Sequence, residues 1–306
     1  ILSDLAEGTA AVSGRVLNLE GQAVDGEAFR RIQQSLSERL PGGVTLGTAD
    51  IGAARGQALE WSARREGDLL TLSGSLPNEE ARDRLLAAAG LKFGTLSIDD
   101  AQDIAAGAPE GLEAAALAAL QALSRLGDGE ARIADGTVSV RGIALSEAAS
   151  GEVARLLAEG LPAGFSAEPA IDIATVPDKV LPAAACQAEL DRLAGLNTVL
   201  FETGQAAIAD HSHGYLDRIA FAARQCGTAR LEIAGHTDAD GSEADNLALS
   251  QRRAQSVLEY LSAAGVSAER MRAVGYGESR PLQDNETDAG KAANRRIEFR
   301  VLSEPE

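Results

Sequence analysis

Aromatic side chains are scarce in this chain, at 3% of its 306 residues, and there is a single methionine. The hydrophobic cores must therefore be built from Ala, Leu, Val and Ile. No run of 18 apolar residues occurs, so no segment predicts a transmembrane helix. A nucleophile elbow, a Ser-His-Asp order and a phosphate-binding loop are also missing, and we expect neither catalytic residues nor a cofactor.

Basic residues are in deficit, with 28 Lys and Arg against 46 Asp and Glu, a net charge of −18. Binding to phosphate groups needs an excess of basic side chains, so nucleic acid is excluded as a partner. An anionic membrane surface is disfavoured for the same reason. The simplest interpretation of the acidic balance is solubility.

Cysteine is limited to Cys186 and Cys226, without the close spacing of a metal site. They can form a disulfide in an oxidising compartment, or remain two buried thiols. The three histidines include the pair His211 and His213 at the start of a predicted helix. A metal needs three or four convergent ligands, so we expect no metal site and expect His236 to hydrogen-bond backbone in a turn.

The length of the chain predicts about two domains, and its N-terminal half repeats a pattern. An alternating strand that ends in glycine is followed by an acidic turn, a helix with one apolar face, and a second strand that ends in Asp-Ile about 30 residues after the glycine. The glycines are Gly21, Gly74 and Gly142.

We place the three units at about residues 5–51, 57–104 and 112–173, with an additional helix at about 111–126. A lone unit cannot bury its helix face, so the units of this domain (1–173) should share one mixed sheet with helices on one face. Residues 174–185 contain Pro177 and Pro182 and predict a short, stiff linker.

The repeat pattern resembles the BON domain, a small αβ module of bacterial envelope proteins. The resemblance rests on the pattern and on the placement of the glycines. It implies an envelope protein or a lipid as partner of the N-terminal half, although no basic patch supports a lipid.

Residues 186–306 form the second predicted domain. An apolar strand at 231–234 leads into a polar turn with Asp238. Ser242 and Asp245 have the spacing of a capping box that starts a helix, and Arg253 lies beside the apolar stripe of that helix. A carboxylate and a guanidinium held near each other suit a zwitterionic ligand. The alternative is an internal salt bridge that only holds the turn.

Four sequence blocks, at residues 199–204, 235–254, 274–281 and 294–299, resemble the OmpA-like peptidoglycan-binding domain in order and spacing. The resemblance implies a β-α-β-α-β core with a mixed sheet and helices on one face, so the whole chain is predicted to be α+β. It implies that Asp238 takes the ammonium of diaminopimelate in the peptide stem and that Arg253 takes its carboxylate. It also implies a disulfide between Cys186 and Cys226.

Further residues are expected around this pair. Thr237, Asn246 and Leu249 should line the same loop and helix start, and Phe201, Thr203 and Gly204 should form a neighbouring wall. Alternation in the last strand should send one of Arg295 and Arg296 to the pocket, and we favour Arg295.

The sequence thus predicts a non-catalytic peptidoglycan-binding protein of the periplasm. Because the chain begins at Ile1 rather than Met, we expect a preceding signal peptide or an anchor to the outer or inner membrane. One alternative is a docking module, in which the N-terminal half binds lipid or protein and the C-terminal domain is a tether. A peptidoglycan hydrolase is a third, less favoured alternative.

Overall fold

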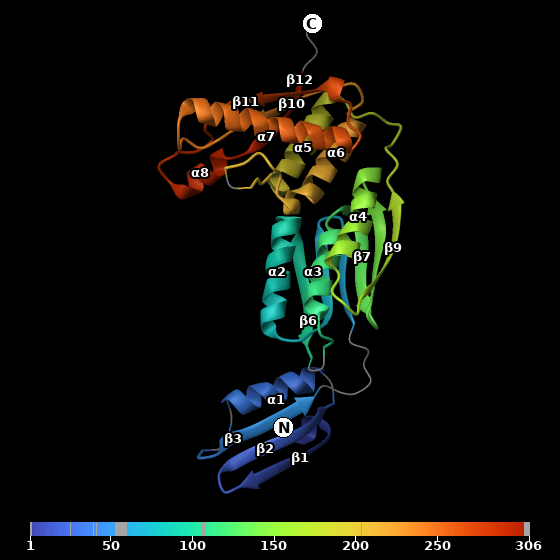
Figure 1. The fold of residues 1–306 in the computed structure, drawn as a ribbon, viewed down its shortest axis with the longest axis vertical. Helices are drawn as coiled ribbons and strands as arrows, with labels where there is room; N and C mark the ends of the chain where they lie inside the picture. Colours follow the sequence, from blue (N-terminus) through green and yellow to red (C-terminus); the bar gives the residue numbers. More distant parts are fainter. Residues whose placement is uncertain are drawn as a thin grey trace.

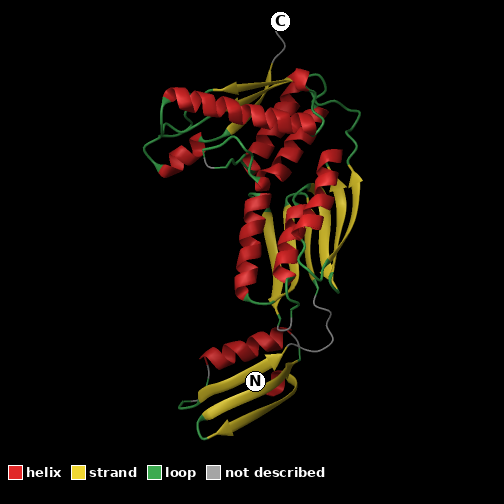
Figure 2. Cartoon of the chain, in the orientation of Figure 1, coloured by secondary structure: helices red, strands yellow, loops and turns green. Residues whose placement is uncertain are grey.

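The computed structural model describes residues 2–24, 26–38, 40, 42–52, 60–105, 108–202 and 204–302. These residues form helices and three mixed sheets, which confirms the predicted α+β class (Figures 1 and 2). A hydrophobic core lies between each sheet and the helices that cover it. The smallest core, in the N-terminal sheet, is covered by a single helix.

The first unit has a sheet of its own, in the order β1-β2-β3. It comprises β1 (Leu5–Ser13), β2 (Val16–Ala23), α1 (Gly26–Glu38) and β3 (Thr45–Gly52), after a short 3-10 helix (Leu2–Asp4). Phe29, Ile32 and Leu36 of α1 are buried against this sheet, as their spacing predicts. The expectation that all three units share one sheet is therefore wrong for the first unit.

The second and third units share a six-stranded sheet in the order β6-β5-β4-β7-β8-β9. The second unit comprises β4 (Trp61–Glu66), β5 (Leu69–Leu76), α2 (Glu79–Phe93) and β6 (Ser97–Ile104). The third comprises α3 (Leu112–Leu123), β7 (Leu126–Ala134), β8 (Thr137–Ala144), α4 (Glu147–Gly160) and β9 (Ser166–Ile173). The three helices cover one face, and the predicted additional helix is α3, whose apolar residues lie in the core (Figure 1).

The repeated glycines do not end their strands, since β2, β5 and β8 each continue for two residues beyond them. Instead they let two backbones approach closely. A Cβ on Gly74 would lie 2.1 Å from the carbonyl oxygen of Glu60 and 2.7 Å from Cα of Trp61. Gly74 also has a φ of +100°, which other residues rarely adopt. Glycine is thus required where the hairpin strands meet.

The C-terminal sheet has the order β11-β10-β12, with β10 parallel to β11 and antiparallel to β12. Its elements are α5 (Ala183–Leu196), α6 (His213–Gln225), β10 (Arg230–Gly235), α7 (Glu243–Ala263), β11 (Met271–Gly275), α8 (Asp288–Asn294) and β12 (Ile297–Leu302), with 3-10 turns at Asp210–Ser212 and Ala268–Arg270. Helix α5 begins inside the predicted linker. The stretch expected to be the first strand of this domain forms only an isolated bridge between Phe201 and Ile208.

A disulfide joins Cys186 of α5 to Cys226 at the end of α6, with the two Cα atoms 5.5 Å apart. Both cysteines lie in the hydrophobic core of this domain. The structure confirms the predicted pairing, and the bond ties the first two helices of the domain together.

A buried ion pair connects the six-stranded sheet to the C-terminal domain. Arg125, which follows α3, is 3% exposed, and its Nε donates to Oδ2 of Asp217 on α6 at 2.7 Å. Its Nη2 donates to the hydroxyl of Tyr260 on α7 at 2.9 Å. A buried ion pair is stable only in one close geometry. The two domains are therefore held together by direct contact as well as by the chain between them.

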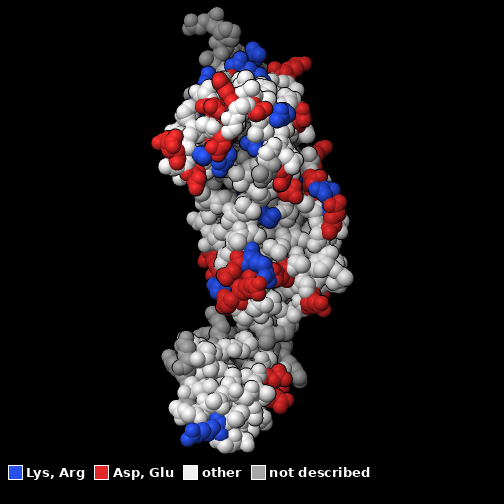
Figure 3. Space-filling model, turned by 60° about the vertical axis from the view of Figure 1, so that its left-hand side comes forward, with Lys and Arg blue, Asp and Glu red and all other residues white. Residues whose placement is uncertain are grey.

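Charged side chains of both signs are interspersed on the face shown in Figure 3, with wide neutral areas between them. Many are paired, as Arg84 is with Glu80 and Glu113. Among the described residues, no helix has both the length and the apolar character needed to cross a membrane.

Candidate functional site

The turn between β10 and α7 is fixed by close backbone packing. A Cβ on Gly235 would lie 2.3 Å from the carbonyl oxygen of Ser250, so the end of β10 rests directly on α7. Ser242 caps the helix, since its Oγ accepts from the backbone N–H of Asp245 at 3.1 Å. The Oγ also donates to the Asp245 carboxylate at 2.6 Å. The predicted helix start is confirmed, and the loop that carries Asp238 is held at both ends.

Asp238 is 8% exposed and binds Arg295 rather than Arg253. Its Oδ2 lies 2.6 Å from Nη1 of Arg295, and its Oδ1 accepts from the backbone N–H of Asp240 at 3.3 Å. A carboxylate has about four lone-pair sites, so acceptor sites on Asp238 remain open. The internal salt bridge considered from the sequence therefore exists, but with a different arginine.

Arg253 lies beside this pair and has no carboxylate partner among the described residues. Its Nε donates to the carbonyl oxygen of Gln205 at 3.0 Å, and its guanidinium carbon lies 4.9 Å from the ring centre of Phe201. Burial lowers the pKa of Arg253, Asp238 opposes the shift, and Arg295 adds to it. The two terminal nitrogens accordingly remain available to a carboxylate ligand.

Arg253 and Arg295 border a small cavity of about 80 Å³, whereas Asp238 is not among the residues that line it. Its lining consists of three arginines, one histidine and three apolar residues: Arg253, Arg295, Arg296, His236, Val199, Leu200 and Phe201. Both Arg295 and Arg296 reach it, so the expectation that one would point to solvent is wrong. Arg295 follows α8 and Arg296 precedes β12, and strand alternation does not apply to either.

Arg295 and Arg296 differ in their solvent exposure and in the number of contacts that hold their side chains. The side chain of Arg295 is 47% exposed, whereas that of Arg296 is 11% exposed and pairs with Glu298. Arg296 also donates to the carbonyl oxygen of Arg280 at 3.2 Å. Arg295 can shift to accommodate a ligand, whereas Arg296 is part of the wall.

From the sequence, the side chain of His236 was expected to hydrogen-bond to the backbone of the turn. The structure does not show such a bond. Neither ring nitrogen has a hydrogen-bond partner in the described part of the chain, although Nε2 lies 3.7 Å from the Glu298 carboxylate. The ring stacks on Tyr276 with centroids 5.3 Å apart. Burial, followed by the charge of Arg296, lowers the pKa of His236 to about 4, so the imidazole is neutral at pH 7.

Asn246 braces the loop from the first turn of α7. Its Nδ2 lies within hydrogen-bond distance of the carbonyl oxygens of Asp238 and Asp240, and 2.6 Å from Glu278. Glu278 was not among the residues predicted for the site, because the sequence shows its segment only as a turn. These contacts make Asn246 part of the support of the loop.

Most of the remaining predicted residues do not line the cavity in the described part of the chain. Thr237 is buried, and its backbone N–H donates to the carbonyl oxygen of Gly277 at 3.0 Å. Leu249 is half-buried on α7, and Gly204 is exposed with a φ of +69°. Thr203 lies outside the described residues. Of the predicted wall, only Phe201 borders the cavity within the described part of the chain.

Comparison with known proteins identifies this part of the chain. Residues 200–295, within the C-terminal domain, match the OmpA family. Outer membrane porin F of Pseudomonas fluorescens is 45% identical over 103 residues, which are 34% of this chain and 32% of that protein. Peptidoglycan-binding protein ArfA of Mycobacterium bovis is 36% identical over 120 residues, 39% of this chain and 36% of the relative.

These matches span about a third of the curated relatives' own length. Among solved structures, the peptidoglycan-associated lipoprotein from Burkholderia pseudomallei is 29% identical, with a TM-score of 0.34. The alignment covers 36% of this chain and 93% of that one.

Proposed function

We propose that the chain binds diaminopimelate-type peptidoglycan through its C-terminal domain, without catalysing a reaction on it. The observation that carries the proposal is the guanidinium edge of Arg253, which pairs with no carboxylate in the described part of the chain and lies close enough to Asp238 to feel its charge. The name of the mycobacterial relative, a peptidoglycan-binding protein, supports it as well.

The chemistry of the pair fits the side chain of diaminopimelate, which ends in an ammonium and a carboxylate on one carbon. Arg253 offers two parallel N–H groups to the ligand carboxylate, a geometry that lysine cannot reproduce. Asp238 accepts from the ammonium through its remaining lone pairs. Arg295 then orients Asp238 and adds positive charge on the side of the ligand carboxylate.

We place this activity in the periplasm, with the protein tethered to an envelope membrane. The disulfide between Cys186 and Cys226 supports an oxidising compartment. For the N-terminal half we retain the BON-like interpretation, because each of its three units has the order strand, strand, helix, strand. These units serve as a spacer or as a docking surface for an envelope protein or lipid.

Retention on purified sacculi tests the site. Asp238→Asn and Arg253→Ala should each weaken binding to sacculi by about 5- to 150-fold, because leaving a partner of a charged hydrogen bond unsatisfied costs about 1–3 kcal/mol. The matched controls are Asp240→Asn, which removes an exposed ion pair with Lys291, and Arg252→Ala, the exposed neighbour on α7. Both should bind like the wild type.

Wild-type retention by either site variant would refute the assignment. Equal losses in the controls would attribute binding to general charge instead of to the pair. Release of soluble muropeptides from the sacculi by the wild-type protein would contradict the non-catalytic part of the proposal.

A further inference from the structure

Strand β1 leaves one edge of the first sheet open. This strand is an outer strand of the sheet and is nine residues long. All of its residues after Leu5 are exposed. Its pairing with β2 is regular from Glu7 to Ser13. Edge strands of monomeric proteins are commonly protected by lysine, proline or a bulge. In β1 the sole charged residue is Glu7, there is no proline, and the one irregularity in its pairing lies at its start, between Leu5 and Glu7.

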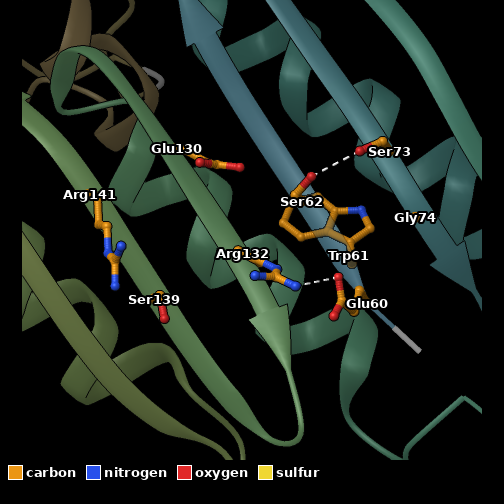
Figure 4. A pocket seen from close by; sticks show the side chains of 9 residues that line it. All are labelled: Glu60, Trp61, Ser62, Ser73, Gly74, Glu130, Arg132, Ser139 and Arg141. Carbon is orange, nitrogen blue, oxygen red and sulfur yellow. Dashed lines mark hydrogen bonds and ion pairs between the residues drawn. The ribbon is translucent and has the colours of Figure 1, made fainter. Parts of the chain in front are cut away.

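In the second and third units, the corresponding edge strands are not open, because they pair with each other. Strand β4 of the second unit runs antiparallel to β7 of the third, with Ala63 opposite Ala131. On either side of this pair, Trp61 lies opposite Ile133 and Arg65 opposite Gly129. Figure 4 shows the two strands side by side on the face without helices. The pairing relates the two units by an approximate twofold axis at the alanines.

The first unit has the equivalent residues in the same register. In each unit, one residue of the first strand lies opposite the repeated glycine of the second strand. These pairs are Gly8 with Gly21, Trp61 with Gly74, and Gly129 with Gly142. Two residues further along the first strand, each unit has an alanine: Ala10, Ala63 and Ala131. Ala10 therefore occupies the position that lies on the twofold axis in the six-stranded sheet.

We propose that β1 pairs antiparallel with β1 of a second copy of this chain, forming a second six-stranded sheet across a twofold axis. Transfer of the β4–β7 register places Ala10 opposite the partner's Ala10. It also places Gly8 opposite the partner's Val12, and Thr9 opposite the partner's Ala11. An isologous contact of this kind is the commonest way in which identical chains assemble.

The composition of β1 fits a second copy as its occupant. In this register Glu7 faces the partner's Ser13, so no like charges are opposed across the pair. Among the described residues from 2 to 52, no helix corresponds to α3, the helix that packs over Trp61 and Ile133 in the core of the six-stranded sheet. At the equivalent positions it has the smaller residues Gly8 and Val12, and the side chain of Val12, which is 64% exposed, offers apolar surface that a partner can cover.

The small core of the first unit gives the pairing an energetic reason. Seven of its described hydrophobic residues are buried in this core, and one helix covers three strands. A unit of about 50 residues buries too small a share of its surface to be more than marginally stable by itself. Pairing of β1 would satisfy the open backbone groups of its edge and join two such cores in one sheet.

The association state of residues 1–306, measured by sedimentation over a concentration series, tests the proposal. The wild type should be a dimer that dissociates on dilution. Thr9→Arg with Ala11→Arg would oppose like charges twice across the axis and should give a monomer. Thr9→Glu with Ala11→Arg would copy the opposition of Glu130 and Arg64 in the six-stranded sheet and should restore the dimer.

A cysteine pair tests the register. Residues opposite each other on antiparallel strands have Cα atoms about 4.5–5.5 Å apart, within reach of a disulfide. Ala10→Cys should therefore form a covalent dimer on oxidation, whereas Val12→Cys, which faces the partner's Gly8, should not. The native cysteines do not interfere, because they are bonded to each other.

A wild-type protein that is monomeric throughout the series would overturn the proposal. So would a dimer that persists in the variant with two added arginines, because its interface would then lie elsewhere. Equal cross-linking at positions 10 and 12 would contradict the register and with it the twofold model. Circular dichroism of each variant should match the wild type, which shows that β1 still folds.

Discussion

Among the residues of the site, His236 depends most on burial for its charge state. Its pKa is about 4 in the folded protein, against an ordinary value near 6.5 in the unfolded chain. Below pH 6.5 the unfolded chain therefore binds a proton that the folded protein does not. The free energy of unfolding must fall as the pH drops from about 6.5 to about 4.

We expect this histidine to contribute up to roughly 3 kcal/mol to that loss, at 1.36 kcal/mol for each pKa unit. His236→Phe keeps a ring against Tyr276 but cannot titrate, so its stability should fall less over the same range. His211 and His213 remain in both proteins, and the difference isolates His236. Urea unfolding at several pH values measures it, and parallel curves for the two proteins would contradict the account.

The sequence indicated Asp238 and Arg253 because both lie in the same family block, close to one turn. It did not indicate that Asp238 pairs with Arg295, 57 positions away. The prediction for Arg295 and Arg296 failed because alternation was applied to residues that precede the strand. Contacts between a loop and a distant helix end depend on the tertiary fold, which local patterns do not encode.

At the scale of elements, periodicity predicted the helices well and the strand ends poorly. The apolar faces of α1 and α4 and the Ser242 cap of α7 are all found in the structure, although the Asp245 carboxylate accepts from the Ser242 hydroxyl instead of completing a capping box. The segment at 199–204 looks like a strand but forms a single bridge, because it has no neighbouring strand to pair with over its length. Strand formation depends on a partner, whereas a helix satisfies its own backbone.

The repeats show the same limit. Their regular spacing predicted three similar units, and the structure contains them. Spacing alone does not specify which strand edges meet, so the sharing of one sheet was predicted for all three units and holds for two. The β4–β7 pair has the large residues Trp61 and Ile133, and β1 has no residue of that size at the equivalent positions. This distinguishes the first unit from the two that share a sheet.

At the scale of the whole molecule, the buried pair of Arg125 and Asp217 couples the two domains. Arg125→Ala would leave Asp217 charged, 2% exposed and without its cation, which costs about 3–5 kcal/mol. We expect calorimetry to show a lower midpoint for this variant and a separation of the transitions of the two domains. The fluorescence of Trp61, the single tryptophan of the chain, reports on the six-stranded sheet in a parallel thermal unfolding experiment.

The matched control is Arg125→Met with Asp217→Leu, which removes both charges and should recover part of the loss. An Arg125→Ala protein that unfolds like the wild type would show that the contact does not couple the domains. No sequence pattern indicates this contact, because its two residues are 92 positions apart and belong to different predicted domains.

The central claim is that Arg253 recognises the side-chain carboxylate of diaminopimelate, and calorimetric titration with two peptides tests it most directly. One stem peptide carries diaminopimelate, and the other carries lysine, which lacks that carboxylate. The wild type should bind the diaminopimelate peptide at least 10-fold more tightly, a difference of about 1.4 kcal/mol. Arg253→Ala should bind both peptides equally weakly. Equal affinity of the wild type for the two peptides would contradict the account.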